Sequence, residues 1–228
     1  MLQEPKPLRA RRPMNRPTAQ QIAQFQKAPS SVVADAMIND GVFAPGIRPL
    51  GGETHIAGPA LTVGCTPADI LALKAAVSLV QPGDVVVSTN GAFTGAATMG
   101  DLIAGRLKNA GAVGFVPDGA VRDATGIIET GLAVWCQGRT PASPFSNGPG
   151  TLGLPISIGN QRVECGDMVV ADGDGVVVVP FARIDEIAAK VAHILSVELS
   201  SEEKVKNGAT TYEDYEALLS SNQTDWVV

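Results

Sequence analysis

The chain has 228 residues, of which 45% are hydrophobic, 4% aromatic and 18% charged. That is enough apolar material for one sizeable core, which excludes a globally disordered chain. The net charge of −6 argues against general nucleic-acid binding, and no apolar run approaches the roughly 20 residues that a membrane helix needs. We therefore expect a cytoplasmic protein with no membrane and no nucleic-acid partner.

Charge is uneven along the chain, because residues 1–17 carry a net positive charge. Their basic side chains, against Glu4 alone, are Lys6, Arg9, Arg11, Arg12 and Arg16. The segment shows no apolar periodicity, so we expect a disordered basic arm, or one that lies over a neighbouring subunit. A contact with RNA or another anionic partner is the alternative.

Hydrophobic periodicity predicts a mixed series of helices and strands after the arm. The first two segments are helices at 18–29, which Thr18 could cap, and at 30–40. There follow a strand at 56–65, a helix at 67–80, a strand at 83–88, a loop at 89–99, a helix at 100–110, a strand at 112–117, a loop at 118–123, a helix at 125–130, a strand at 133–137 and a loop at 138–150. The last segments are β segments at 156–159, 166–172 and 175–180 and a helix from 183 to about 200.

This order predicts an α/β protein with a central β core flanked by helices. Strict alternation of strands and helices is confined to residues 56–137. We expect a single catalytic domain over 18–200, and a C-terminal tail over 201–228 that packs on a neighbouring subunit.

The stretch 100–123 brings separate residues together. Its helix of about 11 residues rises ~16 Å, and the strand that returns, about 6 residues long, spans ~20 Å. Because the two lengths are similar, we expect Asp101 to lie close to Arg122 and Asp123. In open α/β architectures, ligands bind at this edge of the sheet.

The residues at this edge suit a small anion and a hard cation. Arg122 offers a planar fork for a carboxylate, and Asp101 and Asp123 offer oxygen ligands for Mg²⁺ or Mn²⁺. Asp118 either contributes or only braces the loop. The helix N-terminus adds unpaired backbone amides, which we expect at Gly100, Asp101, Leu102 and Ile103.

Other chemistries are excluded by the composition. The chain has only two histidines, which rules out a His-rich zinc or iron site, and no GxSxG motif for a serine hydrolase. Three cysteines without a CxxC do not form a zinc knuckle or a disulfide framework. From the residues alone, two structural alternatives stay open: Asp101 as a helix cap, and Arg122–Asp123 as a local ion pair on a turn.

The run GDLIAGRLKNAGAVGFVPDGAVRD at 100–123 resembles the RraA-like family. That family contains class II pyruvate aldolases that cleave 4-hydroxy-4-methyl-2-oxoglutarate and 4-carboxy-4-hydroxy-2-oxoadipate. Its hallmark is an Asp, twenty intervening residues and then Arg-Asp, a spacing that Asp101, Arg122 and Asp123 match. The resemblance extends over about residues 30–190 through GPALTV (58–63), GDVVV (83–87), GDMVVADGDGVVVVP (166–180) and Asp35.

The resemblance implies a ββα fold like that of a swivelling phosphohistidine domain, in a homotrimer or homohexamer with sites between subunits. It implies that Arg122 binds the carboxylate of a small 2-oxo acid, that Asp123 holds Mg²⁺ or Mn²⁺ partly through waters, and that Asp101 orients water or relays a proton. Cleavage of a C–C bond would leave a pyruvate enolate that the cation stabilises, with oxaloacetate decarboxylation as a companion activity.

The resemblance also carries alternatives. In the family, a C-terminal Glu of a neighbouring subunit often reaches the site, and Glu198, Glu202 and Glu203 are candidates here, or else line a solvated helix face. Members that bind ribonuclease E lack the complete Arg-Asp pair. A non-catalytic regulator with a protein partner therefore stays as an alternative, as does an enzyme acting on a different 2-oxo or sugar acid.

Overall fold

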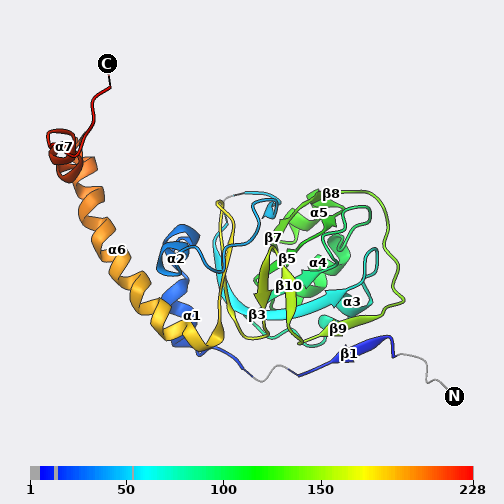
Figure 1. Cartoon of the computed structure of the whole chain (residues 1–228). Coiled ribbons are helices and arrows are strands. Elements are labelled where there is room, and N and C mark those ends of the chain that lie inside the picture. The colour runs from blue at the N-terminus through cyan, green and yellow to red at the C-terminus, as the bar shows by residue number, and fades with distance from the viewer. Residues whose placement is uncertain (1–5, 13–14, 53, 228) are drawn as a thin grey trace. The chain divides into compact units, whose positions relative to one another are not determined.

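A nine-stranded mixed sheet organises the chain (Figure 1). In the computed structural model, which describes residues 6–12, 15–52 and 54–227, its strands are β1 (Leu8–Ala10), β2 (Arg48–Pro49), β3 (Ile56–Cys65), β4 (Val85–Thr89), β5 (Gly114–Pro117), β7 (Ala133–Cys136), β9 (Gly150–Leu152), β12 (Met168–Ala171) and β13 (Val176–Val179). The main path runs β1-β9-β3-β4-β5-β7-β2, and β12 pairs with both β3 and β13. Two small two-stranded sheets are formed by β6 (Ala120–Val121) with β8 (Gly138–Arg139) and by β10 (Ile156–Ile158) with β11 (Gln161–Val163).

Helices lie between and after these strands in the chain. They are α1 (Ala19–Phe25), α2 (Ser30–Ala36), α3 (Leu71–Ala76), α4 (Asp101–Asn109), α5 (Ala124–Glu129), the short 3-10 helix η1 (Phe181–Arg183), α6 (Ile184–Lys206) and α7 (Glu213–Leu219). The strands β3, β4, β5 and β7 are mutually parallel, and α3, α4 and α5 lie between them in the chain. The predicted α/β class and the alternation over 56–137 are therefore confirmed.

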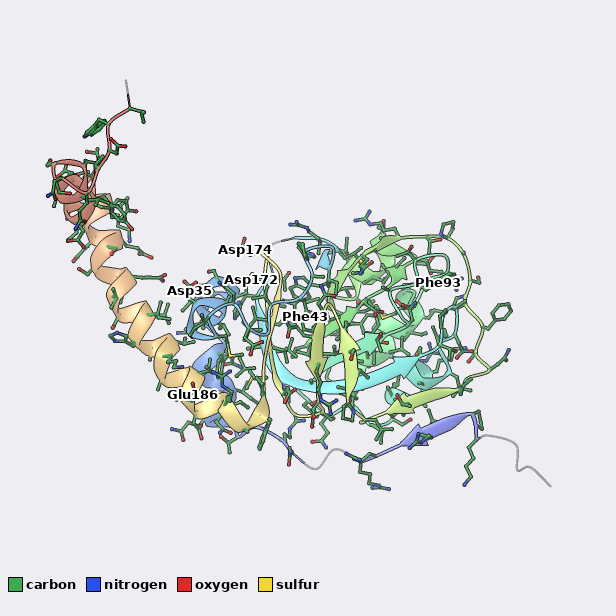
Figure 2. All side chains as sticks on the ribbon, in the orientation of Figure 1. Asp35, Phe43, Phe93, Asp172, Asp174 and Glu186 are labelled. Carbon is green, nitrogen blue, oxygen red and sulfur yellow. The ribbon has the colours of Figure 1, made fainter. Side chains whose placement is uncertain are left out.

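Both faces of the central strands are buried, which explains their almost continuous runs of apolar residues. Val85 and Val87 of β4 point to one face, where Phe43 (Figure 2), β10 and the β12–β13 hairpin cover them. Val86 of β4 and Phe115 of β5 point to the other face, as the alternation of side chains in a strand requires.

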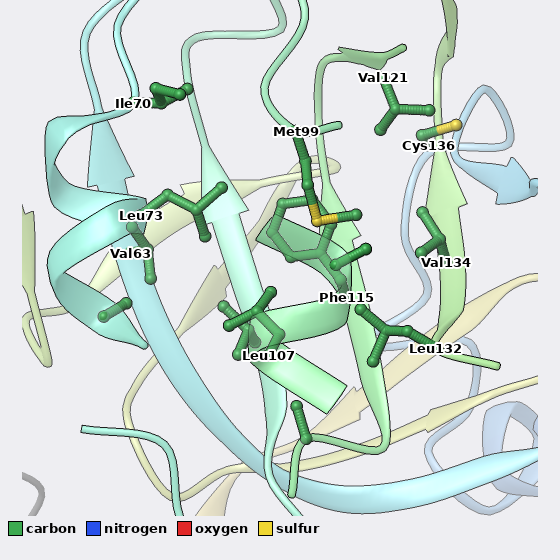
Figure 3. Packing of buried hydrophobic residues seen from close by; sticks show 14 of the residues in the cluster. Val63, Ile70, Leu73, Met99, Leu107, Phe115, Val121, Leu132, Val134 and Cys136 are labelled. Atoms are coloured by element: carbon green, nitrogen blue, oxygen red, sulfur yellow. The ribbon is translucent and has the colours of Figure 1, made fainter. Parts of the chain in front are cut away.

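The second face is covered by the helices that connect the strands. Leu73 of α3 and Leu107 of α4 are fully buried against Phe115, and Met99, just before α4, joins the same cluster (Figure 3). Because this packing fixes α4 on the sheet, it also fixes the position of the helix N-terminus.

The helices differ from their predicted bounds at their ends. Thr18 caps α1 as expected, since its Oγ1 accepts from Gln21 N at 3.2 Å and its N–H donates to Gln21 Oε1 at 2.9 Å. The helix predicted at 67–80 begins only at Leu71, because Ala68 has a left-handed φ of 59° that interrupts it.

The described part of the N-terminal arm is ordered, in contrast to the disordered arm that we expected. The strand β1 runs parallel to β9, and Arg11 N donates to Leu152 O at 2.9 Å. Gly153 permits this close approach of the two strands, because a Cβ there would lie only 2.2 Å from Arg11 O. Its φ of +63° is also a conformation that favours glycine. The partner strand lies more than a hundred residues later in the chain, so local sequence patterns did not reveal the pairing.

The end of the arm is held by an ion pair. Arg16 binds the carboxylate of Asp84, which is only 4% exposed, and Arg16 Nη2 donates to Pro82 O at 2.7 Å. Burial raises the pKa of Asp84, although hydrogen bonds from Gln81 and Arg16 oppose this shift. Removal of Arg16 would therefore leave a buried carboxylate without its cation.

The C-terminal part of the chain, Ala192–Val228, forms a compact unit distinct from Met1–Val191. The first unit thus includes the arm and ends at Val191, whereas the predicted domain ran from 18 to 200. From residue 192 to 227, no side chain that the structure describes is buried. Large apolar side chains are exposed there at Val197, Leu199, Val205, Tyr212, Tyr215, Leu218, Leu219 and Trp226. Across the described ranges, no helix has an apolar stretch long enough to span a membrane.

We expect Arg16→Met to lower the free energy of unfolding by about 1–2 kcal/mol at pH 7, because it leaves Asp84 ionised, buried and unpaired. Lowering the pH protonates Asp84, so the deficit should shrink in acid. Urea unfolding at several pH values measures this, with the exposed Arg9→Met as the control. An equal decrease in the free energy of unfolding in both variants would contradict this role for the ion pair.

Candidate functional site

Hydrogen bonds join the loop before α4 to the loop after β5. Thr98 N donates to Ala120 O at 2.7 Å, and the Thr98 hydroxyl donates to the same oxygen at 2.8 Å. Two residues further on, Arg122 N donates to Met99 O at 2.9 Å. The N-terminus of α4 and the Arg122–Asp123 pair are therefore held beside one another at the carboxyl ends of the parallel strands, where we expected them.

Gly100 makes this approach possible. A Cβ at this position would lie 2.6 Å from Asp123 Oδ2 and 3.2 Å from Arg122 Nε. The φ of Gly100 is −123°, which any residue can adopt, so close approach is what requires the missing side chain. Arg122 Nε and Asp123 Oδ2 are 3.3 Å apart, so the local ion pair that the sequence allowed is also present.

Asp123 adopts an unusual conformation for its position. It is the N-cap residue of α5, yet its φ of 55° is left-handed and its side chain makes no capping hydrogen bond. The carboxylate instead faces Arg122 and Gly100, and 47% of the side chain is exposed. Residues other than glycine that are held in a left-handed backbone conformation are often found at functional sites.

Asp101 lies at the start of α4. Its Oδ1 accepts a hydrogen bond from Leu102 N at 2.7 Å. Its Oδ2 lies against Gly126 of α5, because a Cβ added to that glycine would be only 2.9 Å away. Ile103 N donates to Gly100 O at 3.2 Å. Two of the four amides that we expected to be unpaired, those of Leu102 and Ile103, are therefore bonded within the chain, while the other two have no hydrogen-bond partner in the described ranges.

A cavity of about 710 Å³ opens at this edge of the sheet. All five residues that we predicted to bind substrate line it, namely Gly100, Asp101, Leu102, Ile103 and Arg122. The remaining lining residues are Ile70, Lys74, Val77, Ser78, Met99, Arg106, Ser143 and Pro144. Asp123, the predicted metal ligand, is not part of the lining, but it contacts both Gly100 and Arg122.

Ser143 is a site residue that the sequence did not reveal. Arg122 Nη1 donates to Ser143 Oγ at 2.6 Å, so the guanidinium is held between Ser143 and Asp123. The segment 138–150 was predicted only as a loop. No periodicity or motif in it signals that one of its serines reaches Arg122, because the contact is tertiary.

The loop that carries Ser143 is fixed to the start of α3. Phe145 N donates to Ala68 O at 2.7 Å, and Ile70 N donates to Phe145 O at 3.0 Å. These two backbone hydrogen bonds hold Ser143 and the neighbouring Pro144 as one wall of the cavity.

Asp69 supports the same wall. It is buried, and it accepts from Leu71 N at 2.8 Å, Asn147 N at 2.6 Å and Gly148 N at 3.0 Å. Burial alone would raise the pKa of Asp69, but these hydrogen bonds and the nearby Lys74 hold it below its usual value. Its ionised form therefore stabilises the loop.

Asp118, which the sequence left as either a site residue or a brace, acts as a brace. It is buried, and it accepts from the Thr89 hydroxyl at 2.6 Å and from Asn90 N at 2.8 Å. Asn90 in turn donates from its side-chain amide to Phe93 O at 2.9 Å. These hydrogen bonds fix the loop that leads from β4 towards α4.

The donors at the site fit a hard, oxygen-binding divalent cation such as Mg²⁺ or Mn²⁺ better than a metal that prefers His or Cys ligands. Asp101 and Asp123 contribute carboxylate oxygens, and the cavity lining includes no His or Cys. Among the described residues, no group of three or more His, Cys, Asp or Glu side chains is placed to hold a metal. Mg²⁺ commonly binds through one or two carboxylates and keeps several waters, which matches this sparse donor set.

Comparisons with known proteins agree with this architecture. The family model described as "RraA-like: Aldolase/RraA" matches residues 30–178. A protein of Halalkalibacterium halodurans named "Putative 4-hydroxy-4-methyl-2-oxoglutarate aldolase" is 34% identical over 169 residues, which are 74% of this chain and 80% of that protein.

Two solved structures are similar in fold and sequence. An uncharacterized protein from Pseudomonas syringae pv. tomato has a TM-score of 0.77 at 25% identity, over 86% of this chain and 92% of that one. Streptomyces coelicolor RraAS2, described as an unusual member of the RNase ES inhibitor RraA protein family, has a TM-score of 0.73 at 31% identity, over 83% and 100%.

We expect Asp69→Asn to lower the free energy of unfolding by about 1–3 kcal/mol at pH 7, because one amide oxygen replaces a carboxylate that accepts three hydrogen bonds. The folded-state pKa of Asp69 is depressed, so its contribution is present above the usual Asp pKa and is lost as the pH falls through the folded value. The stabilities of the two proteins should therefore converge in acid, once the pH falls below this depressed pKa.

Urea unfolding measures this difference, with the exposed Asp174→Asn as a matched control. A gap between wild type and Asp69→Asn that persists unchanged in strong acid would show that the ionised carboxylate is not its cause.

Proposed function

We propose that this chain, which belongs to the RraA-like family, is a carbon–carbon lyase that cleaves a small 2-oxo acid and releases pyruvate. The observation that carries the proposal is the cavity where Arg122 meets Asp101 and the N-terminus of α4, next to Asp123. The 34% identical relative, whose name is that of an aldolase, supports the reaction class.

Arg122 would bind the carboxylate of the 2-oxo acid. Its Nε and Nη1 are oriented by Asp123 and Ser143, and within the described ranges Nη2 has no hydrogen-bond partner. The positive end of α4 adds to the attraction for the carboxylate. Since Ser143 fixes the guanidinium before the acid arrives, little side-chain entropy is lost on binding.

Asp101 would move the proton that the reaction requires. When the C3–C4 bond of a 4-hydroxy-2-oxo acid breaks, the C4 hydroxyl loses its proton to form a carbonyl, and C3 of the pyruvate enolate must gain one. Asp101 lines the cavity, and its Oδ2, which is not the oxygen bonded to Leu102 N, could carry this proton directly or through water.

Asp123 would hold a divalent cation, Mg²⁺ or Mn²⁺, partly through waters. When bound, the cation would polarise the 2-oxo group and stabilise negative charge on its oxygen. The left-handed backbone of Asp123 and its lack of a capping bond leave the carboxylate available for this role.

We further propose a homotrimer or homohexamer with sites at the subunit interfaces. The support is the set of exposed apolar side chains in Ala192–Val228, together with Leu102, which is 72% exposed at the mouth of the cavity. The candidates for a partner's carboxylate, Glu198, Glu202 and Glu203, all lie on α6 and are exposed.

The likeness to Streptomyces coelicolor RraAS2 favours a second candidate, a regulator that binds a ribonuclease or another protein. The Arg122–Asp123 pair is complete here, which favours catalysis.

The same site would also serve a lyase acting on a different 2-oxo or sugar acid, because the pocket beyond Arg122 decides the substrate.

We expect Arg122→Met to reduce kcat/KM for pyruvate release from oxaloacetate by about 10²-fold, since it removes the charged fork that binds the carboxylate. The kcat/KM of Arg122→Lys should lie between those of wild type and Arg122→Met, because lysine keeps the charge but loses the paired donors. A coupled pyruvate assay measures both, with Arg162→Met, outside this cavity, as the control. Full activity of Arg122→Met would disprove the assignment, and no activity in wild type would favour the regulator.

We expect EDTA to stop pyruvate release, and Mg²⁺ or Mn²⁺ to restore it. Asp123→Asn should raise the Mg²⁺ concentration needed for half-maximal activity by about tenfold or more, because a neutral amide is a weaker ligand than a carboxylate. Asp174→Asn, which removes an exposed carboxylate elsewhere, should leave that concentration unchanged. Activity that survives EDTA would contradict the metal requirement.

A further inference from the structure

Gly126 lies inside α5, a helix that its own sequence stabilises only weakly. The helix has six residues, and its N-cap residue Asp123 makes no capping hydrogen bond. A glycine within a helix lowers its stability relative to alanine, because glycine loses more conformational freedom on folding. The backbone of Gly126 is not left-handed, so its conformation does not require glycine. The reason for glycine at this position therefore lies in its surroundings.

Asp101 of α4 fills the space beside Gly126. A Cβ added to Gly126 would lie 2.8 Å from Asp101 Cβ, 2.9 Å from its Oδ2 and 3.3 Å from its Cγ. Rotation of the Asp101 side chain could move Oδ2 but not Cβ, because Cβ is bonded directly to the backbone. A methyl group at position 126 would therefore push against the first turn of α4 itself.

Both helices are fixed, so neither can move away to make room. Leu107 holds α4 on the sheet and Ile127 holds α5, and both side chains are fully buried in the same core. Ile127 N also donates to Asp123 O at 2.9 Å, which ties the first turn of α5 to Asp123. Because a close-packed core yields little to added volume, a methyl group at position 126 would displace Asp101.

Gly105 provides a contrast within the same pair of helices. It lies on α4 one turn after Asp101. Outside its own helix, the nearest described atom to a Cβ there would be Thr130 Cγ2 at 3.9 Å, an ordinary van der Waals contact. An alanine therefore fits at position 105 but not at position 126. The difference between the two glycines is the side chain of Asp101.

The missing side chain of Gly126 affects how the Asp101 carboxylate lies. Its Oδ1 accepts from Leu102 N at 2.7 Å, which leaves Oδ2 as the oxygen beside Gly126. The two contacts together orient the carboxylate at the cavity that contains Arg122. A group that transfers a proton must lie within hydrogen-bond reach of the reacting atom, so a displacement of about 1 Å lowers the rate.

We infer that Gly126 is a positioning residue for the reaction, because the absence of its side chain holds Asp101 where Oδ2 can carry the proton. The inference rests on the proposed function, since it takes Asp101 as the group that moves this proton. Gly126 is not part of the cavity lining, so it acts only through Asp101.

Exchange of the pyruvate methyl protons in D₂O, with the full chain and Mg²⁺ present, tests this role. In each exchange the C3–H bond breaks, its electron pair stays in the enolate, and the proton passes to Asp101 and then to solvent, which returns a deuteron. Gly126→Ala should lower kcat for this exchange by about 10- to 100-fold. Its calorimetric affinity for pyruvate should stay within about twofold of wild type, since Arg122 keeps its contact with Ser143.

Gly105→Ala is the matched control, and it should leave both kcat and affinity unchanged because a Cβ fits there. An unchanged kcat in Gly126→Ala, an equal decrease in Gly105→Ala, or a parallel loss of pyruvate affinity would overturn the inference while the proposed function stands. The absence of exchange in wild type would instead remove the proposed function, and this inference with it, so the two failures are distinguishable.

Urea unfolding tests the contact with Asp101 even where Gly126→Ala folds poorly. The urea midpoint of Gly126→Ala should lie below that of wild type. In the Asp101→Gly background the same substitution should no longer lower the midpoint, because the three atoms that the new Cβ would meet are gone. A decrease that persists in that background would show that another contact requires the glycine, and would overturn the inference.

Discussion

The backbone hydrogen bond from Arg122 to Met99 joins two loops, and the rest of the site depends on this junction. The loops follow neighbouring parallel strands, β4 and β5, and so end at the same edge of the sheet. Once they are joined, Gly100 lies against the side chains of Arg122 and Asp123, with no Cβ to hold them apart. The N-terminus of α4, a guanidinium and a carboxylate thereby lie close together.

The core and the surrounding loops make this arrangement rigid. Leu107 and Phe115 lock α4 onto the sheet, so the N-terminus of the helix cannot move independently of β5. On the opposite wall, Asp69 ties the loop that carries Ser143 to α3. Arg122 is consequently oriented from two sides, by Ser143 and by Asp123. Preorganisation of this kind favours a site that stabilises charge during a reaction.

Part of the site follows from sequence alone. The similar lengths of the 100–110 helix and the 112–117 strand were enough to bring Asp101 near Arg122, because helix rise and strand rise are fixed by backbone geometry. The contact of Ser143 with Arg122 could not be predicted, since Ser143 enters the site from a loop without periodicity. The pairing of β1 with β9 was equally hidden, because a three-residue strand gains its stability from a distant partner.

The central claim is that this site generates the enolate of pyruvate, whatever lies on the other side of the broken bond. Proton NMR of pyruvate in D₂O with Mg²⁺ tests it without knowledge of the full substrate. We predict that the enzyme exchanges the methyl protons for deuterium well above the rate in buffer, and that Arg122→Met and Asp101→Asn lose this exchange. Exchange no faster than in buffer, with pyruvate shown to bind, would contradict the account.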